Sequence, residues 1–242
     1  DSLYGVDLLV PHLPPSTRKL HLGESPHFEI ERNSWHTLFE QLPKFLTCFT
    51  VLRQVEIETN SELVSLLPMT LTELDIRPYF PCSAWHLLPP NLTKLSFDTP
   101  EHWPTVNIVD SVGVQCEFSS IPFDLLPRSL TKLKMRYASR ACFCIHPSTM
   151  SNPSYFPPNL TSLELSTDHL SPQVVKLLPS SLTYLKIGNL CEQVCQYLPT
   201  GLKTLDCNHT LMSPNLINFL PKSLTFLKLY LCPPYRPWFD YN

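Results

Sequence analysis

The chain has 242 residues, of which 16% are charged and 43% are hydrophobic, and its formal net charge is -3. This composition excludes a disordered chain, which needs high charge and low hydrophobicity, and the small net charge gives no electrostatic reason to expect nucleic acid or an anionic membrane as a partner. No apolar run is long enough for a transmembrane helix, and no signal segment is recognisable at the start. Proline is frequent (26 residues) and glycine is rare (5), which indicates one Leu-Pro motif used repeatedly.

The first fifty residues are predicted to form the N-terminal end of a repeat array. Residues 13–22 read as a degenerate first repeat, and Asn33 and Ser34 are expected to cap a short helix. The apolar residues of that helix fall at i, i+3, i+4 and i+7, which places on one face Trp35, Leu38, Phe39 and Leu42. Two registers then compete for the next strand, 42–51 and 52–57, and the alternation of β-branched residues favours Val55 and Ile57.

One ten-residue pattern, L-P-x-x-L-T-x-L-x-φ with φ apolar, occurs seven times, at 67–76, 88–97, 126–135, 156–165, 178–187, 198–207 and 220–229. Its prolines are 20–22 residues apart in four of the six intervals, a spacing typical of solenoid repeats. The final L-x-φ predicts a short strand, and the proline belongs at the corner before it. Hydroxyl groups are expected to form a ladder that caps backbone groups at this corner, from Thr72, Thr93, Thr131, Thr161, Thr183 and Thr225.

The segments between these strands predict one or two turns of α-helix or 3₁₀-helix on the opposite, convex side. Residues 171–179 and 213–221 each begin with Ser-Pro, an N-cap followed by proline in the first helical turn. Their apolar side chains are expected to face the core: Val174, Val175, Leu177, Leu178, Leu216, Ile217, Phe219 and Leu220. The longest interval is predicted to hide a degenerate repeat with alternating Val114, Cys116 and Phe118. Residues 137–156 read as an over-long convex excursion.

The repeat pattern resembles the leucine-rich repeat superfamily and, within it, FNIP repeats, although the F-N-x-P tetrad is absent. The resemblance implies an α/β repeat solenoid, a leucine-rich-repeat arc with a concave parallel β-sheet and short helical or 3₁₀ convex segments. We expect a single domain over 1–242, with an N-terminal capping region at 1–50, repeats at 51–231 and a C-terminal cap at 232–242 that covers the last strand. FNIP arrays often act as protein-interaction modules in ubiquitin-ligase adaptors, but no F-box-like segment is visible in 1–12. A bacterial effector-type repeat domain is the alternative within the superfamily.

The concave face is the predicted protein-binding site. In the N-terminal half its outward residues are expected to be mainly acidic, and they include Gln54, Glu56, Glu58, Glu73 and Asp75. In the middle they are expected to be basic, and this change of charge along the face would give a partner a preferred direction. Exposed aromatic residues near the C-terminal end would supply anchors. The site is predicted to comprise Lys132, Lys134, Arg136, Tyr184, Lys186, Phe226, Lys228 and Tyr230.

Cysteine and histidine residues do not indicate a catalytic or metal site. Nine cysteines are an odd number, which excludes a fully paired disulfide framework, and Cys207 is expected to be a small buried hydrophobe. The spacing of Cys142, Cys144 and His146 is tight for zinc, and no nucleophile motif or phosphate loop is present. We therefore expect no enzyme, cofactor or small-molecule substrate, but a cytoplasmic protein-binding module. The alternatives are a structural subunit of a larger assembly and an enzyme assembled from distant residues.

Overall fold

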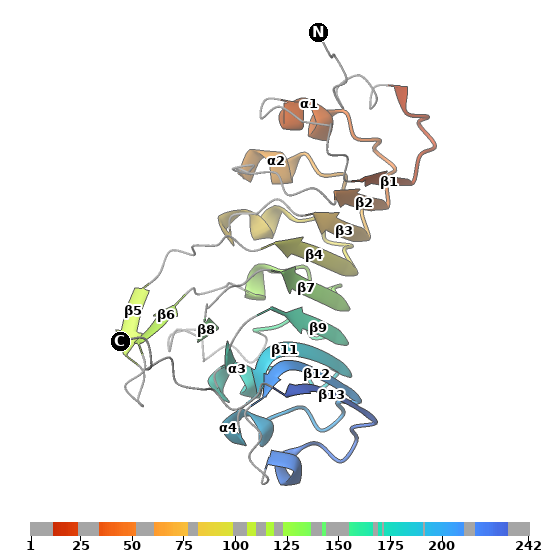
Figure 1. The fold of residues 1–242 in the computed structure, drawn as a ribbon. Helices are drawn as coiled ribbons and strands as arrows, with labels where there is room; N and C mark the ends of the chain where they lie inside the picture. Colours follow the sequence, from red (N-terminus) through yellow and green to blue (C-terminus); the bar gives the residue numbers. More distant parts are fainter. Residues whose placement is uncertain are drawn as a thin grey trace, which may run out of the picture.

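Nine parallel strands stacked in one sheet form the frame of the protein (Figure 1). The computed structural model describes residues 12–23, 34–51, 61–76, 82–98, 106–109, 115–118, 123–136, 142–143, 155–166, 169–170, 172–190, 192–210 and 216–231. The sheet follows the order of the repeats, with β1 (Lys19–Leu22), β2 (Cys48–Val51), β3 (Glu73–Ile76), β4 (Lys94–Asp98), β7 (Lys132–Arg136), β9 (Ser162–Leu165), β11 (Tyr184–Leu190), β12 (Thr204–Thr210) and β13 (Phe226–Leu231). This arrangement confirms the predicted repeat solenoid with a parallel sheet.

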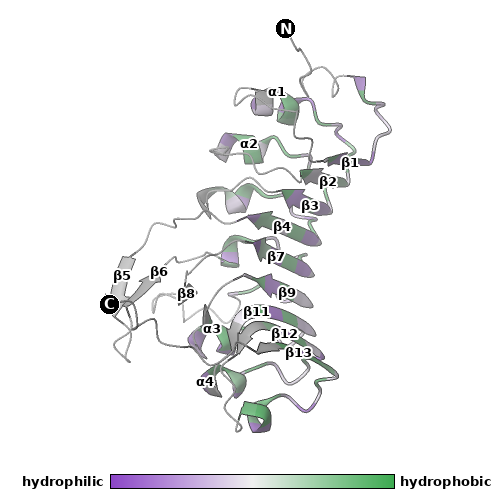
Figure 2. Ribbon diagram, in the orientation of Figure 1, coloured by the Kyte–Doolittle hydropathy of each residue, from purple (hydrophilic) through white to green (hydrophobic). Residues whose placement is uncertain are grey.

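Short helical segments return the chain from one strand to the next on the side opposite the sheet (Figure 1). They are α1 (Ser34–Glu40), α2 (Ser61–Ser65), η3 (Cys82–Leu87), η4 (Phe123–Leu125), α3 (Pro172–Lys176), α4 (Glu192–Cys195) and η6 (Leu216–Phe219). Pro172 is the first residue of α3, as the Ser-Pro motif predicts, and Val174 and Val175 are buried. Hydrophilic and hydrophobic stretches therefore recur in the same order from coil to coil (Figure 2).

Each strand is entered through a turn that the Leu-Pro motif builds. The proline carbonyl accepts the amide of the leucine three residues later, for example Leu160 N to Pro157 O at 3.1 Å. The threonine that follows then bonds to the preceding repeat twice, because Thr161 donates its amide (2.8 Å) and its hydroxyl (3.0 Å) to the carbonyl of Thr131. The same hydroxyl bond recurs at Thr47, Thr72, Thr93, Thr131, Thr183 and Thr225. The predicted threonine ladder is confirmed.

A second hydroxyl ladder runs beside the first and was not predicted from the sequence. Ser181 Oγ donates to the carbonyls of Pro158 and Leu160, each at 2.8 Å, and so ties its turn to the turn of the preceding repeat. Equivalent bonds come from Thr70, Ser129 and Ser223. The signal was present in the sequence, since these residues all immediately precede the leucine of L-T.

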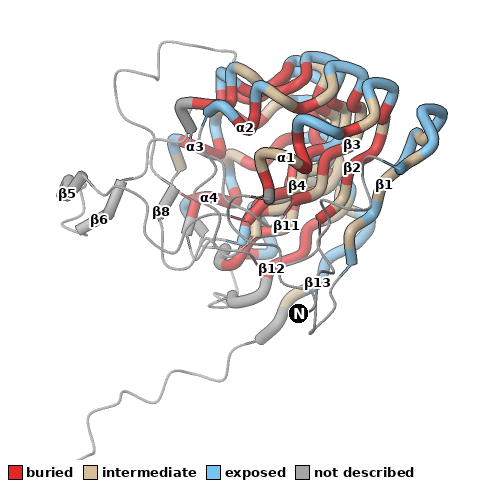
Figure 3. The backbone as a smooth tube through the Cα atoms, turned by 90° about the horizontal axis from the view of Figure 1, so that it is seen from above, coloured by how far each residue is buried: buried red, intermediate tan, exposed pale blue. Residues whose placement is uncertain are grey.

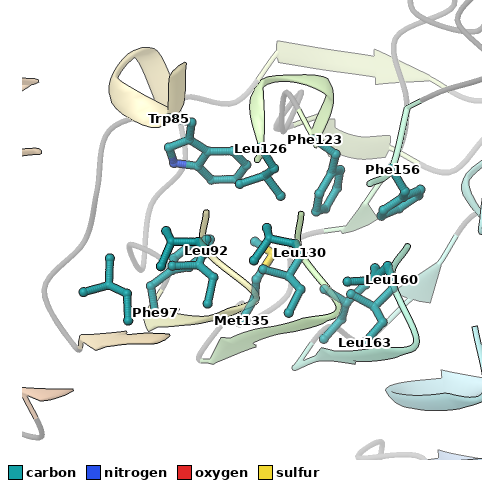
Figure 4. Close-up of a cluster of buried hydrophobic side chains, with 14 of the residues drawn as sticks. Trp85, Leu92, Phe97, Phe123, Leu126, Leu130, Met135, Phe156, Leu160 and Leu163 are labelled. Carbon is teal, nitrogen blue, oxygen red and sulfur yellow. The ribbon is translucent and has the colours of Figure 1, made fainter. Parts of the chain in front are cut away.

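The core lies between the sheet and the convex segments, where buried residues line the inside of the coils between the first and the last (Figure 3). In these coils the leucines of the strands are enclosed, as Leu163 and Leu185 are at 0% exposure. In the middle of the solenoid, the convex side contributes aromatic residues to the core, and Figure 4 shows Trp85, Phe123 and Phe156 side by side above the leucine layer. The ring centroids of Phe123 and Phe156 are 4.5 Å apart, and those of Trp85 and Phe123 are 6.3 Å apart. These contacts join successive repeats into one core.

Two sequence-based strand assignments are wrong. β2 is Cys48–Val51, so the chain uses the 42–51 register, and the favoured Val55 and Ile57 lie outside the described residues. The turn at Pro43 explains the choice, because Leu46 N bonds to Pro43 O at 2.9 Å as in the other repeats. The predicted degenerate repeat around Cys116 is not part of the main sheet. β6 (Gln115–Phe118) pairs antiparallel with β5 (Val106–Val109), and β4 pairs directly with β7.

The last repeat differs from the others because no following repeat covers it within the described residues. Val175 of α3 is 1% exposed, whereas its counterpart Ile217 is 60% exposed and Phe219 is 42% exposed. The expectation that both face the core is therefore wrong. The predicted C-terminal cap, 232–242, lies outside the described residues.

Most of the predicted excursion at 137–156 is also undescribed, apart from β8 (Cys142–Phe143) and the buried Tyr155 and Phe156. β8 pairs in parallel with β10 (His169–Leu170) in a small separate sheet. In the described parts of the chain, no helix is long and apolar enough to cross a membrane.

Candidate protein-binding face

The parallel register aligns the outward side chains of the sheet into columns that run across the strands. The first outward column contains, in sheet order, Lys19, Cys48, Glu73, Lys94, Lys132, Ser162, Tyr184, Thr204 and Phe226. The second outward column contains His21, Thr50, Asp75, Ser96, Lys134, Glu164, Lys186, Asp206 and Lys228. Because β2 takes the 42–51 register, Cys48 and Thr50 stand on the sheet where Gln54, Glu56 and Glu58 were expected.

Arg136 is held between two carboxylates from neighbouring repeats. Its Nε donates to Asp98 Oδ1 and its Nη2 donates to Asp75 Oδ1, both at 2.7 Å. Burial alone would lower the pKa of Arg136, but the two hydrogen bonds and the charges of Asp75 and Asp98 more than offset it and raise the pKa above its ordinary value. Arg136 therefore ties β7 to β4 and β3, and its charge is largely compensated.

The second outward column alternates in charge from β7 to β13. Lys134 Nζ lies 3.0 Å from Glu164, and Lys186 and Lys228 lie 3.9 and 3.8 Å from the same oxygen of Asp206. Asp206 is 7% exposed, and its other carboxylate oxygen has no hydrogen-bond partner. The sequence predicted a basic section in the middle of the face, but the register sets these lysines beside acids, so little free positive charge remains in this column.

Lys132 is the exception among the predicted basic residues. It is exposed on β7, and it forms no ion pair within the described part of the chain. Its neighbour in the first column, Lys94, is already paired with Glu73 at 2.6 Å. Lys132 therefore offers a positive charge that the concave face does not itself neutralise.

A groove of about 300 Å³ is hollowed in this part of the concave face. It extends over β1 to β9, and Lys132, Lys134 and Arg136 are among the side chains that line it. Acids line it from both β3 and β9, and leucines of the strands form part of its floor; the other lining residues are His21, Cys48, Thr50, Glu73, Leu74, Asp75, Lys94, Leu95, Ser96, Leu133, Ser162 and Glu164. The structure thus brings the three central basic residues together in one depression.

The predicted aromatic anchors lie beyond the groove, toward the last strand. Tyr184 on β11 is half-buried, and Phe226 on β13 is 54% exposed. Burial raises the pKa of Tyr184, and the charges of Glu164 and Asp206 raise it further, while Lys228 lowers it. Tyr184 therefore keeps its proton at neutral pH and can donate a hydrogen bond. The side chain of Tyr230 lies outside the described residues.

The cysteines whose side chains the structure describes are buried. They are Cys48, Cys195 and Cys207, and all three are free thiols. Burial, together with Cys195 and Asp206 nearby, raises the pKa of Cys207 to about 12, as suits the core role predicted for it. The described residues contain no group of three or more His, Cys, Asp or Glu side chains that could hold a metal, and the side chains of Cys142, Cys144 and His146 lie outside them.

No family model matches the chain, and no curated protein matches its sequence. Among solved structures, the chain is similar to the leucine-rich repeat-containing protein LegL7 from Legionella pneumophila, with a TM-score of 0.45 and 14% identity over 93% of this chain and 87% of LegL7. It is also similar to CroV588, a circular leucine-rich repeat protein, with a TM-score of 0.47 and 21% identity over 90% of this chain and 34% of CroV588. The repeat solenoid described above follows from this chain's own strand order and register.

Proposed function

We propose that the protein is a non-catalytic binding module that recognises a protein partner on the concave face of its sheet. The observation that carries the proposal is the composition of the first outward column, in which Lys132, without an ion pair to any described residue, shares one surface with the aromatic Tyr184 and Phe226. Partly exposed aromatic side chains are common anchors of protein interfaces. A charge without a partner of its own can bind an opposite charge without first breaking an ion pair.

The remaining predicted residues would act mainly by shaping the surface. Lys134, Arg136, Lys186 and Lys228 already face acids of the same sheet. Because their charges are already balanced within the sheet, these residues would contribute complementarity rather than most of the affinity. We also propose that the protein binds its partner in the cytosol. The FNIP resemblance suggests substrate recognition in a ubiquitin-ligase adaptor as one setting for this binding.

The test is a quantitative pull-down from cell extract with the purified chain as bait. Wild type is compared with Lys132→Glu and Tyr184→Ala, and the matched control is Lys176→Glu on the convex α3, a change of the same charge on the other side of the molecule. Reversal at Lys132 should slow association, and truncation of Tyr184 should speed dissociation, so both should recover less of the same partner. Equal recovery by all four baits would contradict recognition on the concave face.

A structural subunit is the second candidate, and the exposed apolar residues at the C-terminal end of the solenoid favour it. Ile217, Phe219 and Leu227 are 60%, 42% and 39% exposed, although the counterparts of Ile217 and Leu227 in earlier repeats, such as Val175 and Leu205, are buried. An assembly contact at this end would be weakened by Ile217→Ser and left intact by Lys132→Glu. A pull-down that includes both Ile217→Ser and Lys132→Glu as baits therefore distinguishes the two roles.

A further inference from the structure

Large and small side chains alternate along the first outward column from the middle of the sheet to its last strand. Lys132, Tyr184 and Phe226 are the large ones, and Ser162 and Thr204 stand between them. Each large side chain is two strands from the next. Neighbouring strands are about 4.8 Å apart, so successive large side chains are about 9.6 Å apart. The two small residues leave shallow gaps between three regularly spaced anchors.

This spacing matches one regular backbone conformation better than the others. A polyproline II segment has three residues per turn and a rise of 3.1 Å, so residues i, i+3 and i+6 share one face at intervals of about 9.3 Å. An extended strand repeats its faces about every 6.8 Å, and an α-helix returns to the same face after seven residues, about 10.5 Å. Over two intervals, the anchor spacing on the sheet and the repeat of a polyproline II segment differ by about 0.6 Å in total, whereas the sheet and an α-helix differ by about 1.8 Å.

We propose that the concave face binds a polyproline II segment of the partner protein, with a carboxylate over Lys132 and apolar residues three and six positions away over Tyr184 and Phe226. This inference rests on the proposed function and specifies its ligand. Polyproline II segments are bound elsewhere in grooves lined by aromatic residues, because the segment is already ordered and presents flat apolar faces.

The chemistry of the three anchors fits such a segment. Lys132 forms no ion pair with the described residues, and Glu73, the acid of the same column, is already paired with Lys94. Polyproline II has no internal hydrogen bonds, so its carbonyl groups accept from outside donors. The protonated hydroxyl of Tyr184 is such a donor, and Phe226 presents a bare ring.

The acids of the second outward column limit the ligand to few negative charges. Glu164 and Asp206 act electrostatically on Tyr184 from the neighbouring strands, and Asp206 also lies near Lys186 and Lys228. A polyanion laid along the first column would pass these carboxylates after it leaves Lys132. The arrangement therefore favours one carboxylate followed by uncharged residues.

The experiment uses fluorescein-labelled heptapeptides and the full chain, with binding followed by fluorescence anisotropy. The test peptides are Asp-Pro-Pro-Leu-Pro-Pro-Leu and its reversed sequence, because a polyproline II segment can lie in either direction. The matched control peptide, Asp-Pro-Leu-Pro-Leu-Pro-Pro, has the same composition but places its leucines two and four residues from the acid. At least one test peptide should bind about tenfold more tightly than this isomer. Equal binding by the isomers, or binding by none of the peptides, would overturn the proposal.

Charge exchange tests whether the acid sits on Lys132. Lys132→Glu should weaken the better test peptide about tenfold, and a peptide with lysine in place of aspartate should recover that loss on the same variant. Lys44→Glu is the control, since Lys44 is exposed on the turn before β2 and away from the first column. An unchanged affinity in Lys132→Glu would refute the assignment. Because the pull-down does not depend on these peptides, peptide failure alone would leave concave recognition standing with another ligand.

Discussion

Truncation of one leucine in the middle of the array tests whether the repeats share one core. Leu163 on β9 is fully buried and lies in register between Leu133 on β7 and Leu185 on β11. Leu163→Ala removes apolar groups worth about 2.4 kcal/mol at about 0.8 kcal/mol for each buried methylene. Any cavity that remains adds about 24 cal/mol per Å³, which brings the expected loss of unfolding free energy to about 2–5 kcal/mol.

The assay is thermal unfolding followed by circular dichroism. For a chain of this size each kcal/mol shifts Tm by about 2–4 °C, so Leu163→Ala should lower Tm by about 4–20 °C. Hydrogen exchange should show faster exchange in β7 and β11 as well as in β9, because each repeat is stabilised by its neighbours. The control is Ser162→Ala, the adjacent outward residue, which should change Tm little. A Tm within 1 °C of wild type for Leu163→Ala would refute the strand register and the shared core.

Three further predictions follow from particular contacts. Arg136→Met should cost about 2–4 kcal/mol in chemical denaturation, because it leaves the nearly buried carboxylate of Asp98 without this partner; a loss below 0.5 kcal/mol would contradict that role. Thr161→Val should cost only about 0.5–1.5 kcal/mol, since the carbonyl of Thr131 keeps two backbone donors, and a loss above about 3 kcal/mol would assign the hydroxyl more than a capping role. Because burial raises the pKa of Cys207 to about 12, this thiol ionises in the unfolded chain at a lower pH than in the folded chain, so the free energy of unfolding should fall as pH rises from about 9 to about 12. Unfolding melts across this pH range should show a smaller fall for Cys207→Ala than for wild type. An identical dependence on pH in the two proteins would count against this effect of burial.

The repeat architecture could be predicted from the amino-acid pattern alone, because the signals for it are local. The L-P-x-x-L-T-x-L-x-φ pattern specifies a turn, a hydroxyl bond to the preceding repeat and an alternating strand within ten residues, and stacking such units side by side buries the leucines. The α1 helix and the burial of Trp35 and Leu38 followed from helical periodicity for the same reason.

The pairing of charges across the concave face could not be predicted in this way, because it depends on which strands lie side by side. Arg136 and Asp75 are 61 residues apart, yet their pairing at 2.7 Å depends on β4 lying directly beside β7. The sequence pattern placed a degenerate repeat around Cys116 between those strands, which would have separated the two charges. Among the predicted basic residues, which lysine forms no ion pair with the described residues likewise depends on its cross-strand neighbours. The alternation along a strand indicates which side chains point outward, and this signal is local. Whether an outward charge is neutralised depends on which residues the register sets side by side, and the register is fixed only when the strands are stacked.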